Sequence, residues 1–461
     1  MTNALMIDFG STYTKLVAIN IEEATVIAKS QAPTTVDDLM VGLNEALTIL
    51  YENYGNVEFD HKLACSSAGG GLRMVAIGFV KELTAEAAKR SSLGAGAKVI
   101  EVFSYGLDQQ DLFKIKEIAP DMILLSGGTD GGNSAVILEN AQLIAQSGLK
   151  VPVVVAGNKK VAQIVAEILR DADIETIITE NVLPQVDVIN VEPARKAIRE
   201  VFMKEIIKAK GLDKAQSFVG SVLMPTPMAV LKAAELIADG TKEESGLGDI
   251  IIVDVGGATT DLHSVSNPVS SINTSIKGLI EPRAKRTVEG DLGIRHNALT
   301  ILEMVGETKI SQYARLQFDE VDIVKHIHKI AGLPRMVPTN TYEELIDLGL
   351  ARSATEIAIS RHAGTFEEVH FVDGKVKQQT GKDFTFTKIL IGTGGVFTHG
   401  KHGFEILEGA LFDSNIPNSL RPKEPQMFID SQYCLFAIGL LAEINPSVAL
   451  KVAKKALKTN V

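Results

Sequence analysis

The amino-acid sequence predicts an α/β protein with at least two domains. Short apolar or β-branched runs that end in glycine-rich loops alternate with segments of helical periodicity along the whole chain, and this alternation is typical of α/β domains. The 461 residues are about three times the usual length of one domain. The hydrophobic content of 45% supplies enough apolar surface to bury more than one core.

The clearest strands and helices can be placed by their periodicity and their flanking turns. Helices are expected where apolar residues recur at helical spacing over ten or more residues, and strands where short apolar runs precede a glycine turn. The strands are expected at 5–8, 122–125, 151–156, 250–254 and 388–391. The helices are expected at 36–54, 159–172, 193–209, 228–238, 342–363 and 433–441.

The segment GTKEESGLGD, residues 240–249, marks the expected boundary between two halves. It combines charge with three glycines and directly precedes a strand that resembles the first strand of the chain. We expect a first half at 1–240 with an inserted α/β segment at about 90–210, and a second half at 249–461 with an inserted subdomain at about 280–365.

Bulk properties exclude several classes of function. The formal net charge of −11 argues against broad contact with nucleic acid, which is driven mainly by Lys and Arg. Two cysteines, Cys65 and Cys434, are too few for a disulfide framework and lack the spacing of a zinc or iron–sulfur site. No signal-peptide pattern and no run of about 18 apolar residues occurs, so we expect a cytoplasmic protein without a membrane span.

Two segments, LMIDFGSTYTKL and IIVDVGGATTDL, share a layout of apolar strand, Asp, one residue, Gly and hydroxyl residues. This layout indicates an internal repeat with a period of about half the chain. In the first segment Asp8 ends the strand, Gly10 is expected to make a tight reversal with φ > 0, and Lys15 adds a positive charge. The donors offered to an anion there are those of Ser11, Thr12 and Thr14. An ordinary strand-turn-strand hairpin explains this segment alone equally well.

The second segment repeats the chemistry. Asp254 again ends the strand, and Gly256 and Gly257 let the backbone approach an anion closely, while Thr259 follows. Asp8 and Asp254 each stand where a carboxylate could hold Mg²⁺ through water. Two such loops facing each other could grip a polyphosphate from both sides.

A third glycine cluster lies in ILIGTGG. It places Gly392, Gly394 and Gly395 where a strand is expected to turn into a helix, which leaves room for a flat purine and ribose. The cluster SGGTDGGN at 126–133 shows that such glycine groups also occur elsewhere in the chain. It stands in the wrong order for an adenosine site.

The order and spacing of the three loops resemble the phosphate-1, phosphate-2 and adenosine motifs of the actin, heat-shock-chaperone and sugar-kinase superfamily. PTPMAVLKAAELIADG, just before the second loop, looks like the first connecting helix of that superfamily, and FAIGLLAE looks like the second. This resemblance implies two actin-like ATPase halves, with ribonuclease-H-like mixed sheets, around a nucleotide cleft.

Within the superfamily the chain resembles the MutL or GlmL accessory proteins of adenosylcobalamin-dependent glutamate mutase. The resemblance runs over nearly the whole chain. The segments that carry it are DFGSTYTKL, ACSSAGGGLRMVA, LLSGGTDGGN, VVVAGNKKV, ENVLP, RTVEGDLGIRHNA, RHAG, GKDFT, IGTGG and IDSQYCLFAIGLLAEINPSVAL.

This family resemblance implies a slow Mg-dependent ATPase that helps a cobalamin mutase to shed damaged cofactor, with ATP, ADP and the mutase as partners. It assigns Mg²⁺ to Asp8 through water and to Asp254, which alternatively orients the attacking water. The residues that it implies in phosphate contacts are Gly10, Ser11, Thr12, Lys15, Gly256, Gly257 and Thr259, and those at adenosine are Gly392, Gly394 and Gly395.

Alternatives of other classes remain open. A small-molecule kinase shares the fold, and an actin-like filament protein could use the basic last helix, with Lys451, Lys454, Lys455 and Lys458 on one face, as a membrane tether. A terminal helix docked on the core explains the same pattern. The loop with Glu289 and Asp291 could orient water or bind a partner, or could be a solvated turn. His326 and His328 stand two residues apart in a helix and should point to different faces.

Overall fold

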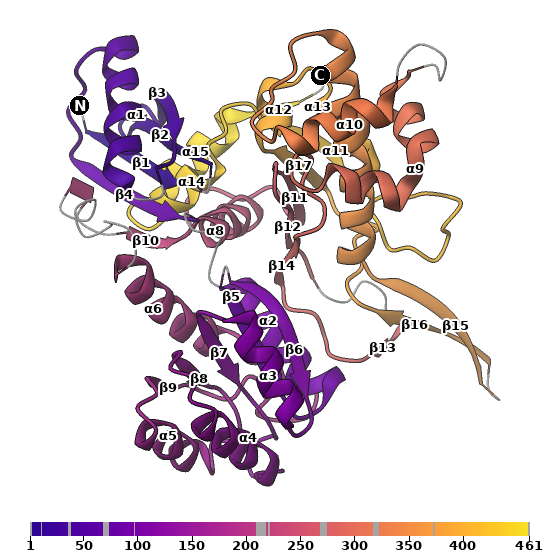
Figure 1. Cartoon of the computed structure of the whole chain (residues 1–461). Coiled ribbons are helices and arrows are strands. Elements are labelled where there is room, and N and C mark those ends of the chain that lie inside the picture. Colours follow the sequence, from indigo (N-terminus) through magenta and orange to yellow (C-terminus); the bar gives the residue numbers. More distant parts are fainter. Residues whose placement is uncertain are drawn as a thin grey trace. The chain divides into compact units, whose positions relative to one another are not determined.

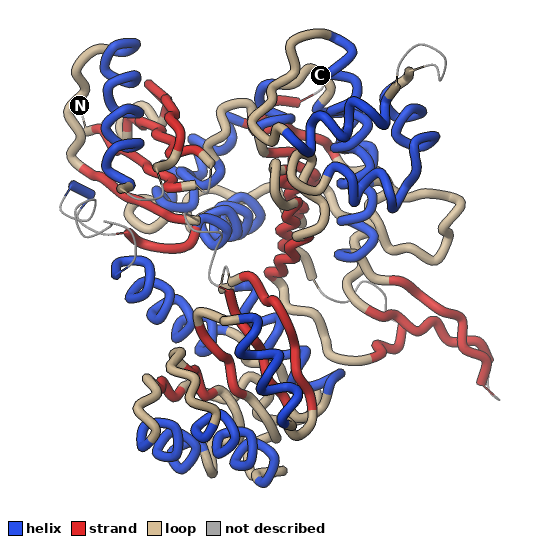
Figure 2. The backbone as a smooth tube through the Cα atoms, in the orientation of Figure 1, coloured by secondary structure: helices blue, strands red, loops and turns tan. Residues whose placement is uncertain are grey.

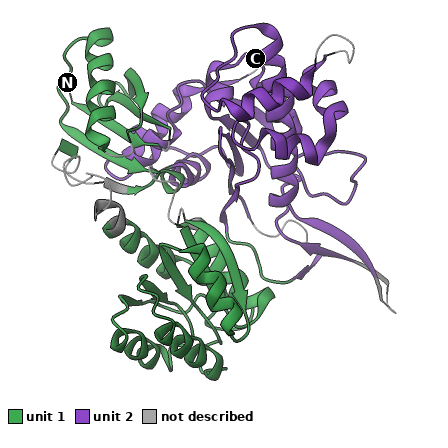
Figure 3. Cartoon of the chain, in the orientation of Figure 1, with its two compact units in different colours: residues 1–229, 278–282 green, residues 230–277, 283–461 purple. Residues whose placement is uncertain are grey.

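The computed structural model describes residues 2–459 except 11, 36–37, 68–72, 96, 209–217, 220–221, 268–273, 317–321 and 372–373. Its elements are labelled in Figure 1. The chain forms two compact units (Figure 3): unit 1 contains residues 1–229 and 278–282, and unit 2 contains residues 230–277 and 283–461. The division into halves at 240–249 with two inserted segments stays a prediction.

Unit 1 begins with a five-stranded sheet in the order β10-β4-β1-β2-β3. β1 to β3 are antiparallel, and β4 and β10 continue the sheet in parallel with β1. Ala4 to Phe9 of β1 are buried without interruption, as expected for a central strand covered on both faces. The strands of this five-stranded sheet are β1 (Asn3–Phe9), β2 (Tyr13–Asn20), β3 (Thr25–Pro33), β4 (His61–Ser66) and β10 (Val222–Pro225).

Helix α1 (Leu39–Tyr54) covers strands β2 and β3. Its N-cap is Asp38, whose side chain accepts from the amide of Met40. Buried Leu39, Leu43, Ala46 and Leu50 recur at helical spacing and form the face that packs on the sheet.

The second sheet of unit 1 is fully parallel, in the order β6-β5-β7-β8-β9. Helices α2 and α6 pack together on one face of this sheet, and α3, α4 and α5 cover the other face. The strands are β5 (Arg73–Gly78), β6 (Lys98–Ser104), β7 (Met122–Leu125), β8 (Val153–Val155) and β9 (Thr176–Ile178). The helices are η1 (Lys81–Ala85), α2 (Glu86–Gly94), α3 (Gln109–Ile118), α4 (Ala135–Gln146), α5 (Ala162–Asp171) and α6 (Glu192–Lys208).

The main sheet of unit 2 has the order β14-β12-β11-β17-β18-β19. β11, β12 and β14 are antiparallel, while β17 and β18 run parallel to β11. Apart from the added β19, this is the strand order and direction of the first sheet of unit 1, so the predicted repeat is present in the topology. The strands are β11 (Ile250–Val255), β12 (Thr260–Val265), β14 (Ala284–Glu289), β17 (Ile389–Thr393), β18 (Gln426–Asp430) and β19 (Leu457–Thr459).

Helix α11 packs against α9 and against strands β11 and β12, and it supplies much of the buried core of unit 2. A separate small sheet has the order β13-β16-β15 (Figure 2). Its strands are β13 (Thr274–Lys277), β15 (Thr365–Phe371) and β16 (Gly374–Thr380). Besides most of α8 (Thr226–Asp239), the helices of unit 2 are α9 (Ala298–Ala314), α10 (Ile323–Gly332), α11 (Thr341–His362), α12 (Gly395–His399), α13 (Gly403–Leu407), η2 (Glu408–Ala410), α14 (Leu435–Leu441) and α15 (Pro446–Ala456).

The strands and helices expected from the sequence are confirmed, with ends displaced by up to three residues among those described. Helix α8 (Thr226–Asp239), for example, begins two residues before the expected start. The last helix differs more: α15 ends at Ala456, and Lys458 lies in strand β19. Buried Ala449, Leu450 and Ala453 dock α15 on the core, as in the docked-helix interpretation. No helix within the described residues is long and apolar enough to cross a membrane.

Candidate functional site: three loops at the ends of buried strands

The first loop joins β1 to β2 in unit 1. Asp8 and Lys15 are register partners in this hairpin, and the amide of Gly10 donates to the carbonyl of Tyr13 at 3.1 Å. Gly10 does not have the expected positive φ. It is required by space instead, because a Cβ at this position would lie 2.6 Å from the carbonyl oxygen of Tyr13. The backbone carbonyl of Thr12 accepts from the amide of Thr34 at 2.9 Å. Ser11 lies outside the described residues.

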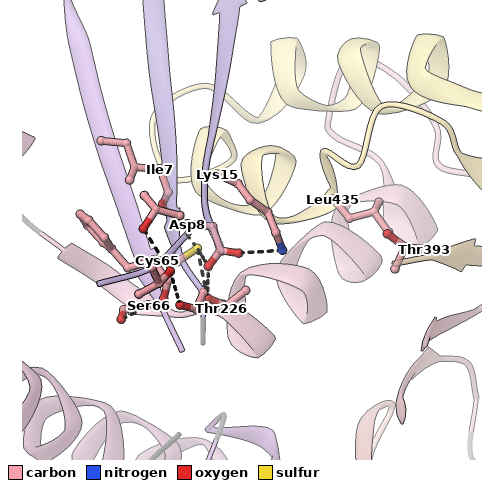
Figure 4. Close-up of polar contacts among 12 residues, drawn as sticks. Ile7, Asp8, Lys15, Cys65, Ser66, Thr226, Thr393 and Leu435 are labelled. Carbon is pink, nitrogen blue, oxygen red and sulfur yellow. Dashed lines mark hydrogen bonds and ion pairs between the residues drawn. The ribbon is translucent and has the colours of Figure 1, made fainter. Parts of the chain in front are cut away.

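The carboxylate of Asp8 is 2% exposed and accepts from three side chains, which Figure 4 shows converging on it. Thr226 Oγ1 donates to Oδ1 at 2.6 Å, and the thiol of Cys65 lies 3.7 Å from the same oxygen. Lys15 Nζ lies 3.4 Å from Oδ2. Lys15 therefore pairs with Asp8 here, whereas the family resemblance assigned it to phosphate. Thr226 and Cys65 were not among the residues proposed from the sequence.

The thiol of Cys65 is fully buried. Burial, followed by the charge of Asp8, raises the pKa of Cys65 well above its ordinary value. The sulfur is thus a neutral S–H donor at physiological pH and not a nucleophilic thiolate.

The second loop joins β11 to β12 in unit 2 and repeats the first in detail. Asp254 and Asp261 are register partners, and the amide of Gly256 donates to the carbonyl of Thr259 at 2.9 Å. Backbone amides of residues 294–296 donate hydrogen bonds to carbonyls of this loop. The carbonyl of Gly257 accepts from the amides of Arg295 and His296, both at 2.9 Å. Gly257 is exposed to solvent within unit 2, so this part of the loop is not covered by other residues of the unit.

Thr259 donates its hydroxyl hydrogen to Asp261 Oδ2 at 2.9 Å, and Arg286 holds the other oxygen of Asp261 at 2.7 Å. A hydroxyl has one hydrogen and two lone pairs. In this arrangement Thr259 can accept from water or bind a cation, and it must release Asp261 before it can donate to a phosphate.

The third loop lies beside Asp254, because β17 is parallel to β11 and places Thr393 opposite Asp254. Gly394 has φ 104°, and a Cβ there would lie 3.0 Å from Asp254 Oδ1. Gly394 caps α12, and Gly395 is the first residue of that helix. Gly392 differs from the prediction. It lies inside β17, not at the turn, and the ring of Phe397 fills the space of its missing side chain.

Asp430, a further buried carboxylate, is hydrogen-bonded to the third loop. It accepts from Thr393 Oγ1 at 3.0 Å and from the amides of Cys434 and Leu435 at 3.0 and 3.1 Å. Burial raises the pKa of Asp430 above its ordinary value, and these hydrogen bonds oppose the shift. Asp430 thereby joins the end of β17 to the first turn of α14.

The carboxylates of Glu289 and Asp291 are held by Arg361, from the last turn of α11. Its guanidinium contacts Glu289 at 2.6 Å and Asp291 at 2.8 and 2.9 Å. Burial raises the pKa of Glu289, whereas the hydrogen bond from Arg361 lowers the pKa of Asp291. One arginine therefore fixes both carboxylates, although the side chain of Asp291 remains 38% exposed.

Signals for the missed residues were present in the quoted segments, but the contacts are distant in sequence. Thr226 belongs to the first connecting-helix segment, Arg361 to RHAG and Asp430 to IDSQY.

No cluster of three His, Cys, Asp or Glu side chains suited to a metal occurs in the part of the chain that is described. Mg²⁺ usually keeps several waters and takes one or two carboxylates, so Asp8 in the first loop and Asp254 in the second are of the kind that this ion takes.

The two sheets of equal strand order, each with an Asp-Gly loop at its first hairpin, define an α/β protein built on an internal repeat. Comparison with known proteins gives the family. Residues 4–457 match the model of the MutL protein family, and the chain belongs to this family. It is 48% identical to Protein MutL of Clostridium tetanomorphum over 457 residues, which cover 98% of each chain.

Solved structures give weaker likenesses. Component A of (R)-2-hydroxyglutaryl-CoA dehydratase from Acidaminococcus fermentans is 11% identical with a TM-score of 0.32, covering 99% of both chains. Plasmodium falciparum glycerol kinase with ADP is 12% identical with a TM-score of 0.38, covering 100% of this chain and 93% of the kinase. These scores are too low to add to the assignment.

Proposed function

We propose that this protein is an ATP-dependent reactivating factor for an adenosylcobalamin-dependent mutase of the glutamate mutase type, and that it binds and slowly hydrolyses ATP. The observation that carries the proposal is the pair of matching hairpins, in which Asp8 and Asp254 each end a buried strand beside a glycine loop. The whole-length match to the MutL protein family supports it.

In this proposal Asp8 and Asp254 hold Mg²⁺, mainly through water, and the metal supplies charge neutralisation at the phosphates when it is bound. Backbone groups of Gly10, Ser11, Thr12, Gly256 and Gly257 cradle phosphate oxygens, with Thr259 and Lys15 beside them. Gly392, Gly394 and Gly395 flank the adenosine, with Gly394 and Gly395 at the turn and Gly392 behind it.

Lys15 would have to exchange its partner during the cycle. Its ammonium group pairs with Asp8 at 3.4 Å, and an arriving phosphate offers a stronger charge. Release of Lys15 would leave Asp8 Oδ2 able to accept from a water that Mg²⁺ holds when it is bound. Thr259 makes the corresponding exchange when it leaves Asp261.

The test is reactivation. A glutamate-mutase-type enzyme is inactivated with a cofactor analogue and incubated with the purified protein, Mg-ATP and fresh adenosylcobalamin. Recovery of mutase activity that requires both ATP and this protein is expected. ATP loss matched by phosphorylation of a small metabolite would instead favour the kinase alternative, and no recovery with any cobalamin mutase would contradict the proposal.

A further inference from the structure

The parallel sheet of unit 1, β6-β5-β7-β8-β9, has no part in the proposed nucleotide function (Figure 1). Its strand order reverses at β5, because the chain passes from β5 outward to β6 and then returns to β7 on the other side of β5. Ligands of open parallel sheets bind outside the carboxyl ends of the strands, where the strand order reverses. A ligand of this sheet is therefore expected at the loops that follow β5 and β7.

Two buried asparagines tie the loop after β7, residues 126–134, to the loops after β8 and β9. Asn158, after β8, accepts from the amide of Gly131 at 3.0 Å and donates to the carbonyls of the next two residues, both at 3.2 Å. Asn181, after β9, donates to the carbonyl of Gly128 at 3.0 Å. Both asparagines are at most 2% exposed. The loop after β7 is therefore held in one conformation by residues from two other loops.

Backbone segments approach one another closely at the end of β7. Gly128 has φ 68°, and a Cβ on it would clash with the carbonyl oxygen of Asn133. A Cβ on Gly157, in the loop after β8, would lie 2.9 Å from the amide nitrogen of Gly127. Glycine at position 157 therefore leaves the amide of Gly127 uncovered by a side chain.

Three successive amides of this loop, those of Gly127, Gly128 and Thr129, donate to no acceptor in the part of the chain that is described. Gly127 and Gly128 are buried. A buried N–H without an acceptor is rare, because it costs free energy comparable to a lost hydrogen bond. Successive amides of this kind form concavities that bind anions. The three donors therefore indicate an acceptor that comes from outside the chain.

The same loop leads into helix α4, and its surroundings are positively charged. The N-cap of α4, Ser134, makes no side-chain hydrogen bond to the helix. In the first turn the amides of Ala135 and Ile137 likewise have no acceptor among the described residues, and a helix N-terminus attracts anions. Lys160, in the loop after β8, is exposed and forms no ion pair within the described residues.

The single carboxylate of the loop, Asp130, is neutralised by its own partners. Its Oδ1 accepts from the amide of Lys159 at 3.0 Å and from Nδ2 of Asn181 at 3.1 Å. Its Oδ2 lies 3.3 Å from the ammonium group of Lys159. An arriving anion therefore meets unpaired amides and Lys160, while the acidic group is already paired.

We propose that the carboxyl edge of this sheet is a second ligand site, separate from the nucleotide loops, which binds the phosphate group of a phosphorylated small molecule. The amides of residues 127–129 and of the first turn of α4 bind the phosphate oxygens, and Lys160 adds its charge. A phosphate ester offers three strong acceptor oxygens and up to two negative charges, which suits several unpaired donors better than the two oxygens and single charge of a carboxylate.

The rest of the ligand is organic, because apolar side chains lie exposed beside the phosphate donors. The carbonyl of Pro184 accepts from the amide of Asp130 at 3.0 Å, which joins the loop after β9 to the loop after β7. Shortly after Pro184, Val186 is 63% exposed and Val188 is 46% exposed. These two side chains supply apolar surface for an organic group attached to the phosphate.

The test measures hydrogen exchange of residues 122–138 in the full chain with two probes, inorganic phosphate and phenyl phosphate. Phenol and sodium chloride of equal ionic strength are the blanks. We expect both phosphates to slow exchange at 127–137 by about threefold or more, because bound amides must release their acceptor before they exchange. Phenyl phosphate should reach this effect at the lower concentration, and the blanks should have none. Segments 8–15 and 254–261, measured in the same samples, report the nucleotide loops separately.

Two variants separate binding from folding. Ser134→Asp places a carboxylate at the N-cap of α4, where it accepts from the first-turn amides, so it should raise the melting temperature and yet abolish the protection by phosphate. Lys160→Glu should weaken phosphate binding by about fivefold or more. Lys116→Glu is its matched control, because Lys116 is also exposed and lies in the last turn of α3, which leads to the opposite edge of the sheet. This control should bind phosphate as the unmodified protein does.

Absence of protection at 127–137 with both phosphates at millimolar concentration would overturn the inference. Protection that persists unchanged in Ser134→Asp would overturn it as well, and so would equal weakening by Lys160→Glu and Lys116→Glu, which would show a general effect of charge. Protection by inorganic phosphate alone would contradict the assignment to an organic ester. The proposed nucleotide function stands or falls independently of these outcomes.

Discussion

Gly394 lies so close to Asp254 that a β-carbon on it would stand 3.0 Å from the carboxylate oxygen Oδ1 and 2.4 Å from the carbonyl oxygen of Val255. Its φ of 104° also belongs to the region that side chains rarely adopt. The second and third loops, which both lie in unit 2, therefore meet at a position where only glycine fits. A β-carbon on the next residue, Gly395, would meet no neighbouring heavy atom within 4 Å.

The two neighbouring glycines give a matched pair of variants. Gly394→Ala should lose about 2–4 kcal/mol of unfolding free energy, because it combines backbone strain with a clash against backbone. Gly395→Ala, at the first position of α12, should stay within about 0.5 kcal/mol of the unmodified protein. Urea unfolding of both variants measures this difference, and equal stabilities would contradict the close approach described here.

Ligand binding should be visible as added stability. Mg-ATP at about 100 times its dissociation constant is expected to contribute roughly 2.7 kcal/mol to the folded state, because it binds the native chain alone. Thermal unfolding with Mg-ATP, Mg-ADP or Mg²⁺ alone measures the effect. An unchanged melting temperature at millimolar Mg-ATP would argue against a nucleotide site.

The two loop carboxylates should matter more for hydrolysis than for folding. Asp8→Asn and Asp254→Asn keep the size and one acceptor oxygen but remove the charge that would hold Mg²⁺. Each is expected to lower the rate of ATP hydrolysis by about a hundredfold or more. Asp173→Asn is the control: its side chain is 95% exposed and its φ of 55° suits asparagine. Hydrolysis at the unmodified rate in either loop variant would disprove its role.

Arg361 should be more important for stability than an exposed ion pair. Arg361→Ala leaves Glu289, which is 9% exposed, and Asp291 without their shared cation. A loss of about 1–3 kcal/mol is expected at neutral pH. Adding Glu289→Gln should restore part of it, because the uncompensated buried charge is removed. Urea unfolding of the two single variants and the double variant tests this, and additive losses would show that the pair does not interact.

Acid sensitivity should come partly from two buried histidines. Burial lowers the pKa of His263 and His362 well below the ordinary value of 6.5. Each therefore binds its proton more readily in the unfolded chain, so its contribution to stability is present above about pH 6.5 and is lost as the pH falls. His362 bonds Thr287 and Ser264, both at 2.8 Å, whereas Nδ1 of His263 is buried without a hydrogen-bond partner in the described part of the chain.

The variant His263→Phe isolates this effect. Removing one such proton-binding group should flatten the dependence of unfolding free energy on pH below 6.5 by up to about 1.4 kcal/mol per pH unit. His328→Phe, at an exposed position of α10, is the matched control. Unfolding curves between pH 5 and 8 measure both slopes, and identical slopes for the two variants would contradict the assignment.

The sequence by itself determined the features that depend on near neighbours. Strand ends, helix spans and the two Asp-Gly hairpins could be predicted because turn chemistry and apolar periodicity are local, and Asp8 and Lys15 are only 7 residues apart. The repeated layout around Asp254 could be recognised for the same reason. Gly10 was correctly placed in a turn, although lack of space, and not positive φ, is what requires it.

Only the tertiary structure decided which distant residues complete the loops. Thr226 reaches Asp8 across 218 positions, and Arg361 reaches Glu289 across 72. Gly392 lies inside a strand because β17 pairs with β11 through Asp254 and Thr393, a register that no turn signal in ILIGTGG specifies. Such contacts follow from strand order and helix docking, whose energy comes from burying surfaces of segments far apart in the chain, so a local pattern does not encode them.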